Sequence, residues 1–190
     1  MSLIISELFL LISFVLIALL ITGSIVYSTV KLGISPMPSS NKAHLAMIQL
    51  INETGSGTIV DLGSGWGNFV IRIAKKYPQR QIVGYELSFL PWLTSSCLKK
   101  ILRLQNLTLH RTNFYHADLS MACVLTCYLF PKAMEKINHK LQVEKSDVHF
   151  LISNNFALPS WQPYKTIQLS DFYKSPIYLY KIGQTKTEIK

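Results

Sequence analysis

Two patterns of hydrophobic and polar residues alternate along the chain after residue 40. Short runs rich in β-branched and aromatic residues are typical of buried strands. Longer stretches with apolar residues every three or four positions are typical of helices that cover a sheet. The strand-like runs are residues 58–62, 81–86, 107–112, 122–130, 148–154, 166–170 and 177–182. The helical stretches are residues 44–53, 67–77, 91–104 and 131–141.

The order of these elements predicts an α/β fold. Strands with few polar positions, separated by amphipathic helices, indicate a mostly parallel sheet with helices on both faces. No helical stretch separates the last two strands, so we expect them to form an antiparallel hairpin at the sheet edge. Ser40 or Asn41 is expected to cap the first helix, and Pro91 and Pro131 are expected in the first turns of two others.

The first part of the chain has a different pattern. Residues 8–30 include no charged side chain, and residues 8–21 read LFLLISFVLIALLI. As a helix the uncharged run would extend about 34 Å, enough for a hydrocarbon core of about 30 Å. A cleaved signal peptide would need a basic start and an A-x-A cleavage pattern, and this chain has neither. A buried core helix fits poorly because the run is apolar all round. We therefore expect a retained transmembrane helix.

Charges beside this run predict its orientation. Lys31 and Lys42 follow it and only Glu7 precedes it. The positive-inside rule then places the remainder of this single-pass chain on the cytoplasmic or matrix-equivalent side. The expected parts are an anchor over 1–31, a Pro/Ser-rich connector over 32–42, an α/β domain over 43–184 and a tail over 185–190.

Composition excludes several classes of protein. Charged residues make up 15% and hydrophobic residues 49% of the chain, which is too apolar for intrinsic disorder. Three cysteines exclude a disulfide scaffold, and Cys97, Cys123 and Cys127 are expected as free thiols. Cys123 and Cys127 lie in an apolar run and the five histidines are scattered, so no metal site is predicted.

The positive charge is concentrated after the anchor. The chain carries +9, and residues 31–190 carry +10 because 19 bases meet nine acids there. A domain this basic attracts polyanions, either anionic lipid or nucleic acid. Arg72, Lys75, Lys76 and Arg80 are expected on the helix after the first strand. They form either a solvated face or a contact surface for anionic lipid or an acidic partner.

The stretch VDLGSGWGNFVIRIA, at residues 60–74, holds the most informative motif. A predicted strand ends near Asp61, then Gly63, Gly65 and Gly67 occupy alternate positions, and a helix begins at once. Glycines at such a turn allow a sharp change of direction and close approach of a ligand to the backbone. Because ligands of open α/β sheets bind beyond the carboxyl ends of strands, this loop is a candidate cofactor site.

Charge near the loop indicates the class of ligand. A dinucleotide loop presents bare N–H groups to a pyrophosphate, which the carboxylate of Asp61 would repel; Asp61 instead suits an ammonium group. The loop also lacks G-x-G-x-x-G and G-K-[ST]. Glu86 ends the second strand, 21 residues after Gly65, where a carboxylate accepts both ribose hydroxyls. A ribose contact without a phosphate contact fits S-adenosylmethionine.

VDLGSGWG and VGYELS resemble the first two motifs of class I S-adenosylmethionine-dependent methyltransferases. SPMPSS, GYEL followed by PWL, ADLS, YLFPKAMEKINHKL and FALPSWQP are similar to segments of small membrane-anchored protein lysine methyltransferases. Those enzymes are related to the mitochondrial methyltransferases of the ATP synthase c subunit and the adenine nucleotide translocase. The resemblance covers about residues 34–182. It implies a Rossmann-like class I methyltransferase sheet and a lysine of a membrane-associated protein as methyl acceptor.

The resemblance also assigns cofactor contacts. The residues that match the cofactor loop are Asp61, Gly63, Ser64, Gly65 and Gly67. Glu86 matches the ribose acid, and Leu87 would pack beside the adenosine. Asn113 falls where the family usually has an acid that meets the adenine amino group; its carbonyl oxygen still accepts that bond.

The acceptor channel is expected at the tips of the fourth and fifth strands. The candidates are Tyr128, Phe130, Phe156 and Trp161. Apolar surroundings lower the pKa of a lysine by disfavouring its charged form, and aromatic faces hold ammonium groups. Ordinary core packing accounts for each of these aromatic residues equally well. No Asn-Pro-Pro-Tyr motif is present, so no DNA substrate is expected.

Three functional hypotheses follow from the sequence. The first is a methyltransferase for a protein lysine, and the anchor favours it because it raises the effective concentration of a membrane-associated substrate. The second is a methyltransferase for a small-molecule, lipid or RNA acceptor, although no RNA-recognition motif is visible. The third is a catalytically idle scaffold that binds S-adenosylmethionine at the membrane.

Overall fold

The computed structural model describes residues 6–16, 18–19, 22–23, 39–143 and 148–182. The chain divides into two compact units, Met1–Met37 and Pro38–Lys190. In the first unit, helix is described at residues 6–16, 18–19 and 22–23. Within the described residues no helix has the length and apolar character needed to span a membrane. The predicted span over residues 8–30 falls partly outside them, at 17, 20–21 and 24–30.

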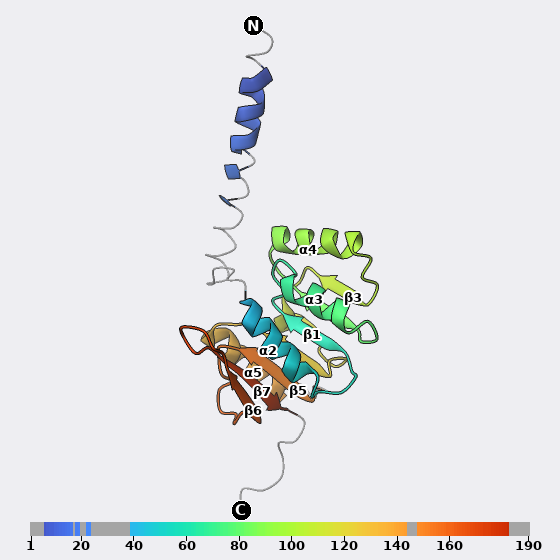
Figure 1. The fold of residues 1–190 in the computed structure, drawn as a ribbon, viewed down its shortest axis with the longest axis vertical. Helices are drawn as coiled ribbons and strands as arrows, with labels where there is room; N and C mark the ends of the chain where they lie inside the picture. Colours follow the sequence, from blue (N-terminus) through green and yellow to red (C-terminus); the bar gives the residue numbers. More distant parts are fainter. Residues whose placement is uncertain (1–5, 17, 20–21, 24–38, 144–147, 183–190) are drawn as a thin grey trace, which may run out of the picture. The chain divides into compact units, whose positions relative to one another are not determined.

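The second unit is built on one seven-stranded sheet (Figure 1). In chain order its strands are β1 (Ile59–Leu62), β2 (Ile82–Tyr85), β3 (Leu107–His110), β4 (Val124–Cys127), β5 (Phe150–Asn154), β6 (Lys165–Gln168) and β7 (Pro176–Lys181). Across the sheet the order is β3-β2-β1-β4-β5-β7-β6. The first five strands are parallel, while β7 is antiparallel to both β5 and β6. The predicted parallel sheet and C-terminal edge hairpin are confirmed.

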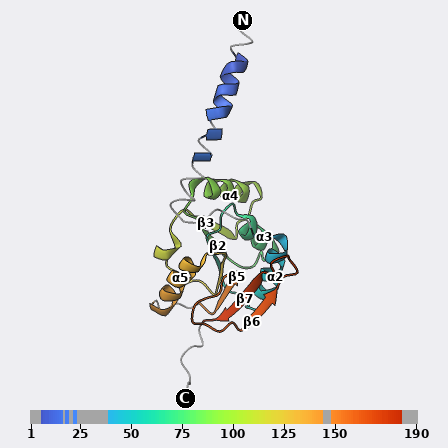
Figure 2. The ribbon, with the colours of Figure 1, turned by 90° about the vertical axis from the view of Figure 1, so that its left-hand side faces the viewer.

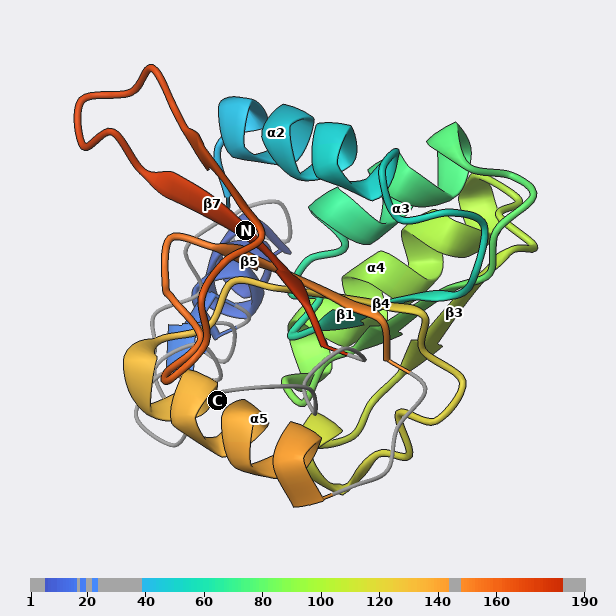
Figure 3. The ribbon, with the colours of Figure 1, turned by 90° about the horizontal axis from the view of Figure 1, so that it is seen from below.

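The helices of this unit cover both faces of the sheet. They are α2 (Asn41–Ile51), α3 (Asn68–Lys76), α4 (Phe89–Ile101) and α5 (Pro131–Val143), and a short 3-10 turn spans Phe114–His116. Figures 2 and 3 show α2, α3 and α4 on one side and α5 on the other. Right-handed crossovers require this, because the chain moves outward through β2 and β3 and then returns to β4 and β5 in the opposite direction.

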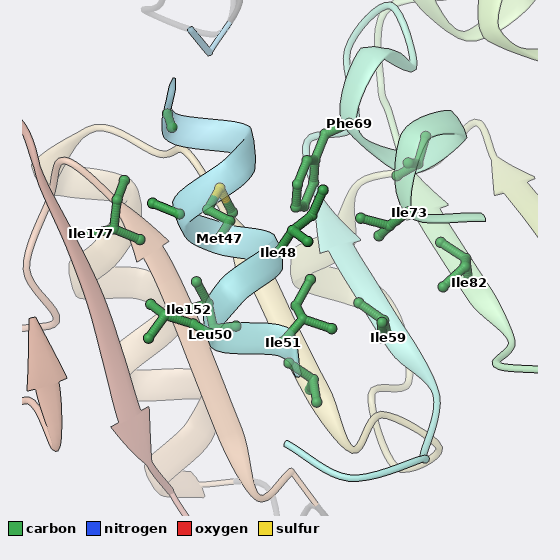
Figure 4. Packing of buried hydrophobic residues seen from close by; sticks show 14 of the residues in the cluster. Met47, Ile48, Leu50, Ile51, Ile59, Phe69, Ile73, Ile82, Ile152 and Ile177 are labelled. Atoms are coloured by element: carbon green, nitrogen blue, oxygen red, sulfur yellow. The ribbon is translucent and has the colours of Figure 1, made fainter. Parts of the chain in front are cut away.

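One hydrophobic layer joins α2 and α3 to the sheet (Figure 4). Alternate strand residues point to the same face, so Ile59, Ile82 and Ile152 meet Leu50 of α2 and Ile73 of α3. All five side chains are fully buried. Since burial of each such side chain stabilises the fold by about 1.5–3 kcal/mol, this layer holds the two helices against the strands.

The opposite face is covered by α5 and by the irregular segment 155–164 that connects β5 to β6. Met134 of α5 is fully buried there. In the segment, the buried Leu158 donates its backbone N–H to the hydroxyl oxygen of Tyr180 at 3.0 Å. This hydrogen bond fixes an irregular backbone over a hydrophobic layer that a helix would otherwise cover.

The predicted helix starts agree with the structure. Ser40, rather than Asn41, caps α2, and its Oγ accepts the backbone N–H of Ala43 at 3.1 Å. Pro91 lies in the first turn of α4, and Pro131 begins α5. A backbone N–H in the first turn has no acceptor within the helix. Proline, which lacks this N–H, therefore costs no hydrogen bond at either position.

The prediction for Arg80 was wrong. This residue follows α3, which ends at Lys76, and it is buried instead of lying on a solvated helix face. Its Nε donates to the carbonyl oxygen of Gly57 at 2.7 Å, and its Nη1 donates to Thr54 Oγ1 at 3.4 Å. The turn before β2 brings the guanidinium against the carbonyl group of Gly57 in the preceding loop, and these two bonds compensate its burial only in part, because the buried Nη2 has no hydrogen-bond partner among the described residues.

We expect Gly67→Ala to lower the free energy of unfolding by about 2–4 kcal/mol. Gly67 has a φ of +85°, and a Cβ there would lie 2.6 Å from the Cβ of Ser95 on α4. Gly65→Ala is the matched control, because its φ is +54° but its Cβ would meet no atom within 4 Å. That variant should lose only about 1–2 kcal/mol. Urea denaturation measures both, and equal losses would contradict the close approach of Gly67 to Ser95 of α4.

Candidate active site

The predicted cofactor residues all lie at the carboxyl edge of the parallel strands. There the chain leaves β1 for β2 on one side, and it later returns to β4 on the other side of β1. The loops that follow β1 and β4 therefore diverge. Ligands of open α/β sheets bind in the crevice formed at such a switch point.

The glycine loop is a tight turn between β1 and α3. Gly63, Gly65 and Gly67 have φ values of +85°, +54° and +85°, which residues with a side chain rarely adopt. The backbone N–H groups of Gly63 and Ser64 both donate to the carbonyl oxygen of Tyr85, at 2.9 and 2.8 Å. The turn is therefore tied to the end of β2.

Glu86 connects this loop to the start of α4. Its Oε2 accepts the backbone N–H of Gly65 at 2.9 Å, and its Oε1 accepts the backbone N–H of Ser88 at 2.7 Å. The side chain is buried. Each carboxylate oxygen has a second lone pair, so Glu86 holds both segments and still has capacity to accept two ribose hydroxyls.

Asp61 is buried next to this loop. It pairs in register with Thr126 of β4, whose hydroxyl donates to Asp61 Oδ1 at 2.7 Å. Burial raises the pKa of Asp61 to about 7; the Thr126 hydrogen bond opposes this rise, and the negative charge of Glu86 adds to it. A nearby cation would favour the ionised form, so the site is electrostatically prepared for a positive ligand group.

The residues present fit S-adenosylmethionine. Within the described parts of the chain, the buried Ser64 Oγ has no hydrogen-bond partner, and a Cβ on Gly65 would enter open space. Leu87, beside Glu86, is 38% exposed and offers an apolar surface for an adenosine. Asn113 Oδ1 accepts the backbone N–H of Tyr115 at 3.1 Å, which leaves one lone pair for an adenine amino group.

Two of the four predicted channel residues lie together. Cys127 pairs with Leu62, so Tyr128 leaves the sheet beside the glycine loop. Its ring stacks on that of Phe156, which follows β5, with centroids 6.1 Å apart and an interplanar angle of 18°. The stacked pair therefore spans the tips of two neighbouring strands.

The other two channel candidates are placed differently. Phe130 and Trp161 pack, as Phe156 also does, against the hydrophobic layer on the α5 face, and the stacked pair does not include them. The Nε1 of Trp161 donates to Asn138 Oδ1 on α5 at 2.8 Å. This hydrogen bond gives Trp161 a structural task, which is to fasten segment 155–164 to the helix.

Sequence reasoning missed three buried polar residues near the same edge. Besides Thr126, Ser153 Oγ donates to the carbonyl oxygen of Phe156 at 2.6 Å. Asn154 Nδ2 donates to Ser39 Oγ at 3.0 Å, which connects the end of β5 to the residue before the α2 cap. Each missed residue is a polar position in an otherwise apolar strand. Because a buried polar group needs a partner, that signal was available in the sequence.

The chain is similar to proteins that are named as lysine methyltransferases. The family model described as the ANTKMT methyltransferase domain matches residues 61–165. A protein-lysine N-methyltransferase of Saccharolobus islandicus (strain REY15A) is 26% identical over 154 residues, which cover 79% of this chain and 94% of the relative. A lysine N-methyltransferase of Xenopus laevis, named for the ATP synthase c subunit, is 35% identical over 113 residues, which cover 57% of this chain and 47% of the relative. The chain thus matches about half the length of the Xenopus protein.

A solved structure is also similar. An RNA methyltransferase from Salinibacter ruber in complex with S-adenosyl-L-homocysteine has a TM-score of 0.70 and 26% identity. The match covers 80% of this chain and 97% of that chain. Fold and site together define a class I methyltransferase, whose methyl donor is S-adenosylmethionine. Because the family match spans more than half of its residues, the chain belongs to the ANTKMT methyltransferase domain family.

Glu86→Ala should weaken binding of S-adenosylhomocysteine by about 1–3 kcal/mol, because it removes charge-assisted hydrogen bonds to ligand and loop. Isothermal titration calorimetry measures the change. Glu53→Ala is the control: Glu53 is an exposed acid whose Oε1 lies 2.6 Å from Lys165 Nζ, and its loss should leave the affinity unchanged. Equal affinity of Glu86→Ala and the unaltered protein would remove Glu86 from the site.

Affinity for S-adenosylmethionine should rise with pH up to about 7, by at most about tenfold per pH unit. Asp61, with its pKa raised to about 7, is neutral below that pH and attracts the ligand's ammonium group only when ionised. The ligand amine stays protonated over this interval, because its ordinary pKa is about 8. Calorimetry with 5′-methylthioadenosine, which lacks the ammonium, and with the Asp61→Asn variant should give flat profiles. A flat profile for S-adenosylmethionine as well would show that Asp61 does not face the ammonium.

Proposed function

We propose that the protein methylates the side-chain nitrogen of a lysine in a protein acceptor. The match to the Saccharolobus protein, which is named a protein-lysine N-methyltransferase, covers 94% of that protein and supports this proposal. The observation that carries the proposal is the stacked pair of Tyr128 and Phe156 beside the glycine loop. Aromatic faces at the end of a cofactor crevice suit a long side chain that ends in an amine.

The chain's own residues have two tasks in such a reaction. When bound, the cofactor supplies a methyl group on a positively charged sulfur, and the lysine must present a free electron pair. Apolar surroundings promote loss of the lysine proton because they disfavour the charged form, and Tyr128 and Phe156 provide such surroundings. Asp61 and Glu86 hold the donor in place. Correct positioning of the two reactants then accounts for most of the acceleration.

An RNA acceptor is the second candidate. The Salinibacter protein is named an RNA methyltransferase, and this chain carries a net charge of +9. Sites for single-stranded nucleic acid combine a basic groove with aromatic side chains on which nucleobases stack. A nucleobase would stack on the same Tyr128–Phe156 pair. The identity of the methylated atom distinguishes the two candidates.

We also propose that residues 1–31 anchor the enzyme in a membrane, with residues 43–184 on the cytoplasmic or matrix-equivalent side. The support is the uncharged stretch over residues 8–30 and the bases that follow it. Among the described residues of that stretch, Phe9 and Phe14 are 69% and 71% exposed, so a nonpolar environment would favour them. An anchored enzyme would meet a membrane-associated acceptor at a raised effective concentration.

Membranes incubated with the protein and methyl-labelled S-adenosylmethionine should carry the label on a protein lysine, identified by mass spectrometry after proteolysis. Tyr128→Leu and Phe156→Leu should each lower kcat/KM for that acceptor by about tenfold and leave cofactor affinity unchanged. Tyr164→Leu is the control, since Tyr164 is an exposed aromatic residue just before β6, the edge strand that β7 separates from β5.

Other labelling patterns would contradict the proposal of a lysine acceptor. Label confined to RNA would support the second candidate, and label on lipid or a small molecule would point to acceptors of that kind. Cofactor binding without any label would identify a catalytically idle scaffold.

A further inference from the structure

Helix α4 exposes an apolar side to solvent. Of its thirteen residues only Pro91 and Ser95 are buried. Phe89, Leu93 and Ile101 are 45%, 39% and 74% exposed. Residues four positions apart lie on the same side of a helix, so Phe89, Leu93, Cys97 and Ile101 form one strip along α4. We call this surface the α4 outer face; its members are Phe89, Leu93, Cys97 and Ile101.

The position of α4 leaves this face without cover from the rest of the described domain. Figures 1 and 2 show the helix at one end of the domain, next to α3 and to β3, the edge strand of the sheet. Its buried residues face those elements, so the outer face points away from them. Soluble monomeric proteins rarely expose a continuous apolar strip of this kind, and such strips mark contacts with membranes or partners.

The charged residues of the segment that contains α4 are all bases. Residues 87–117 contain four bases and no acid. Lys99 and Lys100 lie in the last turn of α4 and Arg103 follows it, so these bases flank one end of the strip. At the other end the guanidinium of Arg111 lies over the ring of Phe89, 5.0 Å from its centroid. Apolar side chains thus lie between bases at both ends.

We propose that the α4 outer face lies in the surface of a membrane that contains anionic lipid. Its apolar side chains would enter the boundary between head groups and acyl chains, and Lys99, Lys100, Arg103 and Arg111 would contact the lipid phosphates. A second copy of the chain is a poor partner for this face. A contact between the α4 outer faces of two copies would bring eight bases together without an acid. The proposal rests on the proposed membrane location and is independent of the methyl acceptor.

Docking of α4 would place the cofactor site at the lipid surface. The helix begins three residues after Glu86, and the backbone N–H of its N-cap, Ser88, donates to the Glu86 carboxylate at 2.7 Å. A membrane contact along α4 therefore holds this carboxylate and the glycine loop beside the head groups. The acceptors selected in this way would be those whose lysine projects close to the membrane surface.

Cys97 provides a reporter within the α4 outer face, because its thiol is free and exposed whereas Cys127 is buried. The full chain, with Cys123→Ala in every variant, would be labelled at Cys97 with a polarity-sensitive fluorophore. It would then be reconstituted in vesicles of phosphatidylcholine, with or without phosphatidylserine. The control is Cys97→Ser with Val143→Cys, because Val143 is an exposed apolar residue that ends α5 on the opposite face of the sheet.

With phosphatidylserine present, we expect blue-shifted emission from the Cys97 label and quenching by brominated acyl chains, both reversed by high salt. The label at position 143 should show neither effect. Replacing Lys99, Lys100 and Arg103 with Gln should reduce the docking equilibrium about a hundredfold, at about fivefold per base.

Three results would overturn the proposal. A Cys97 label that stays polar and unquenched, in protein recovered with the vesicles, would refute docking of α4 but leave the anchor intact. A label shielded to the same extent without phosphatidylserine would mean that the anchor segment or another copy of the chain covers the face. Protein that does not float with either kind of vesicle would refute the membrane location together with the α4 contact.

Discussion

The hydrogen bond from the Gly65 backbone N–H to Glu86 is the contact on which the rest of the site depends. Three glycines in left-handed conformations lose more chain entropy on folding than other residues, so the turn after β1 requires an external acceptor to define it. Glu86 provides that acceptor and also binds Ser88 at the start of α4. Because each of its oxygens keeps a second lone pair, the same carboxylate can shape the loop and recognise the cofactor.

Asp61 is the residue by which we propose that the site selects the charge of its ligand. The carboxyl is buried, its hydrogen-bond donor is Thr126, and its pKa is raised to about 7 by burial, with the charge of Glu86 adding to the effect. Two acidic groups this close disfavour a phosphate and are relieved by a cation. This charge is a physical reason for the loop to favour a methyltransferase cofactor, which carries positive charge and no phosphate, over a dinucleotide.

The two faces of the sheet have different proposed roles. On one side, segment 155–164 takes the place of a covering helix and brings Phe156 against Tyr128 at the tips of β4 and β5. On the other side, α4 packs on an edge strand and leaves apolar side chains in solvent. The proposed acceptor channel and the proposed lipid contact thus flank the cofactor loop, and both relate to a substrate at a membrane surface.

The sequence alone was sufficient to predict the elements and their class, because hydrophobic spacing, helix caps and prolines act over a few neighbouring residues. It also indicated the glycine loop and Glu86 as candidate site residues, whose separation along the chain follows from one strand–helix–strand unit. Tertiary structure decided which distant residues meet. The contacts of Asp61 with Thr126, of Tyr128 with Phe156 and of Arg80 with Gly57 all depend on strand order and loop path. The apolar pattern of α4 predicted burial against the sheet, but the helix lies beside an edge strand, and there only one side of it finds a partner.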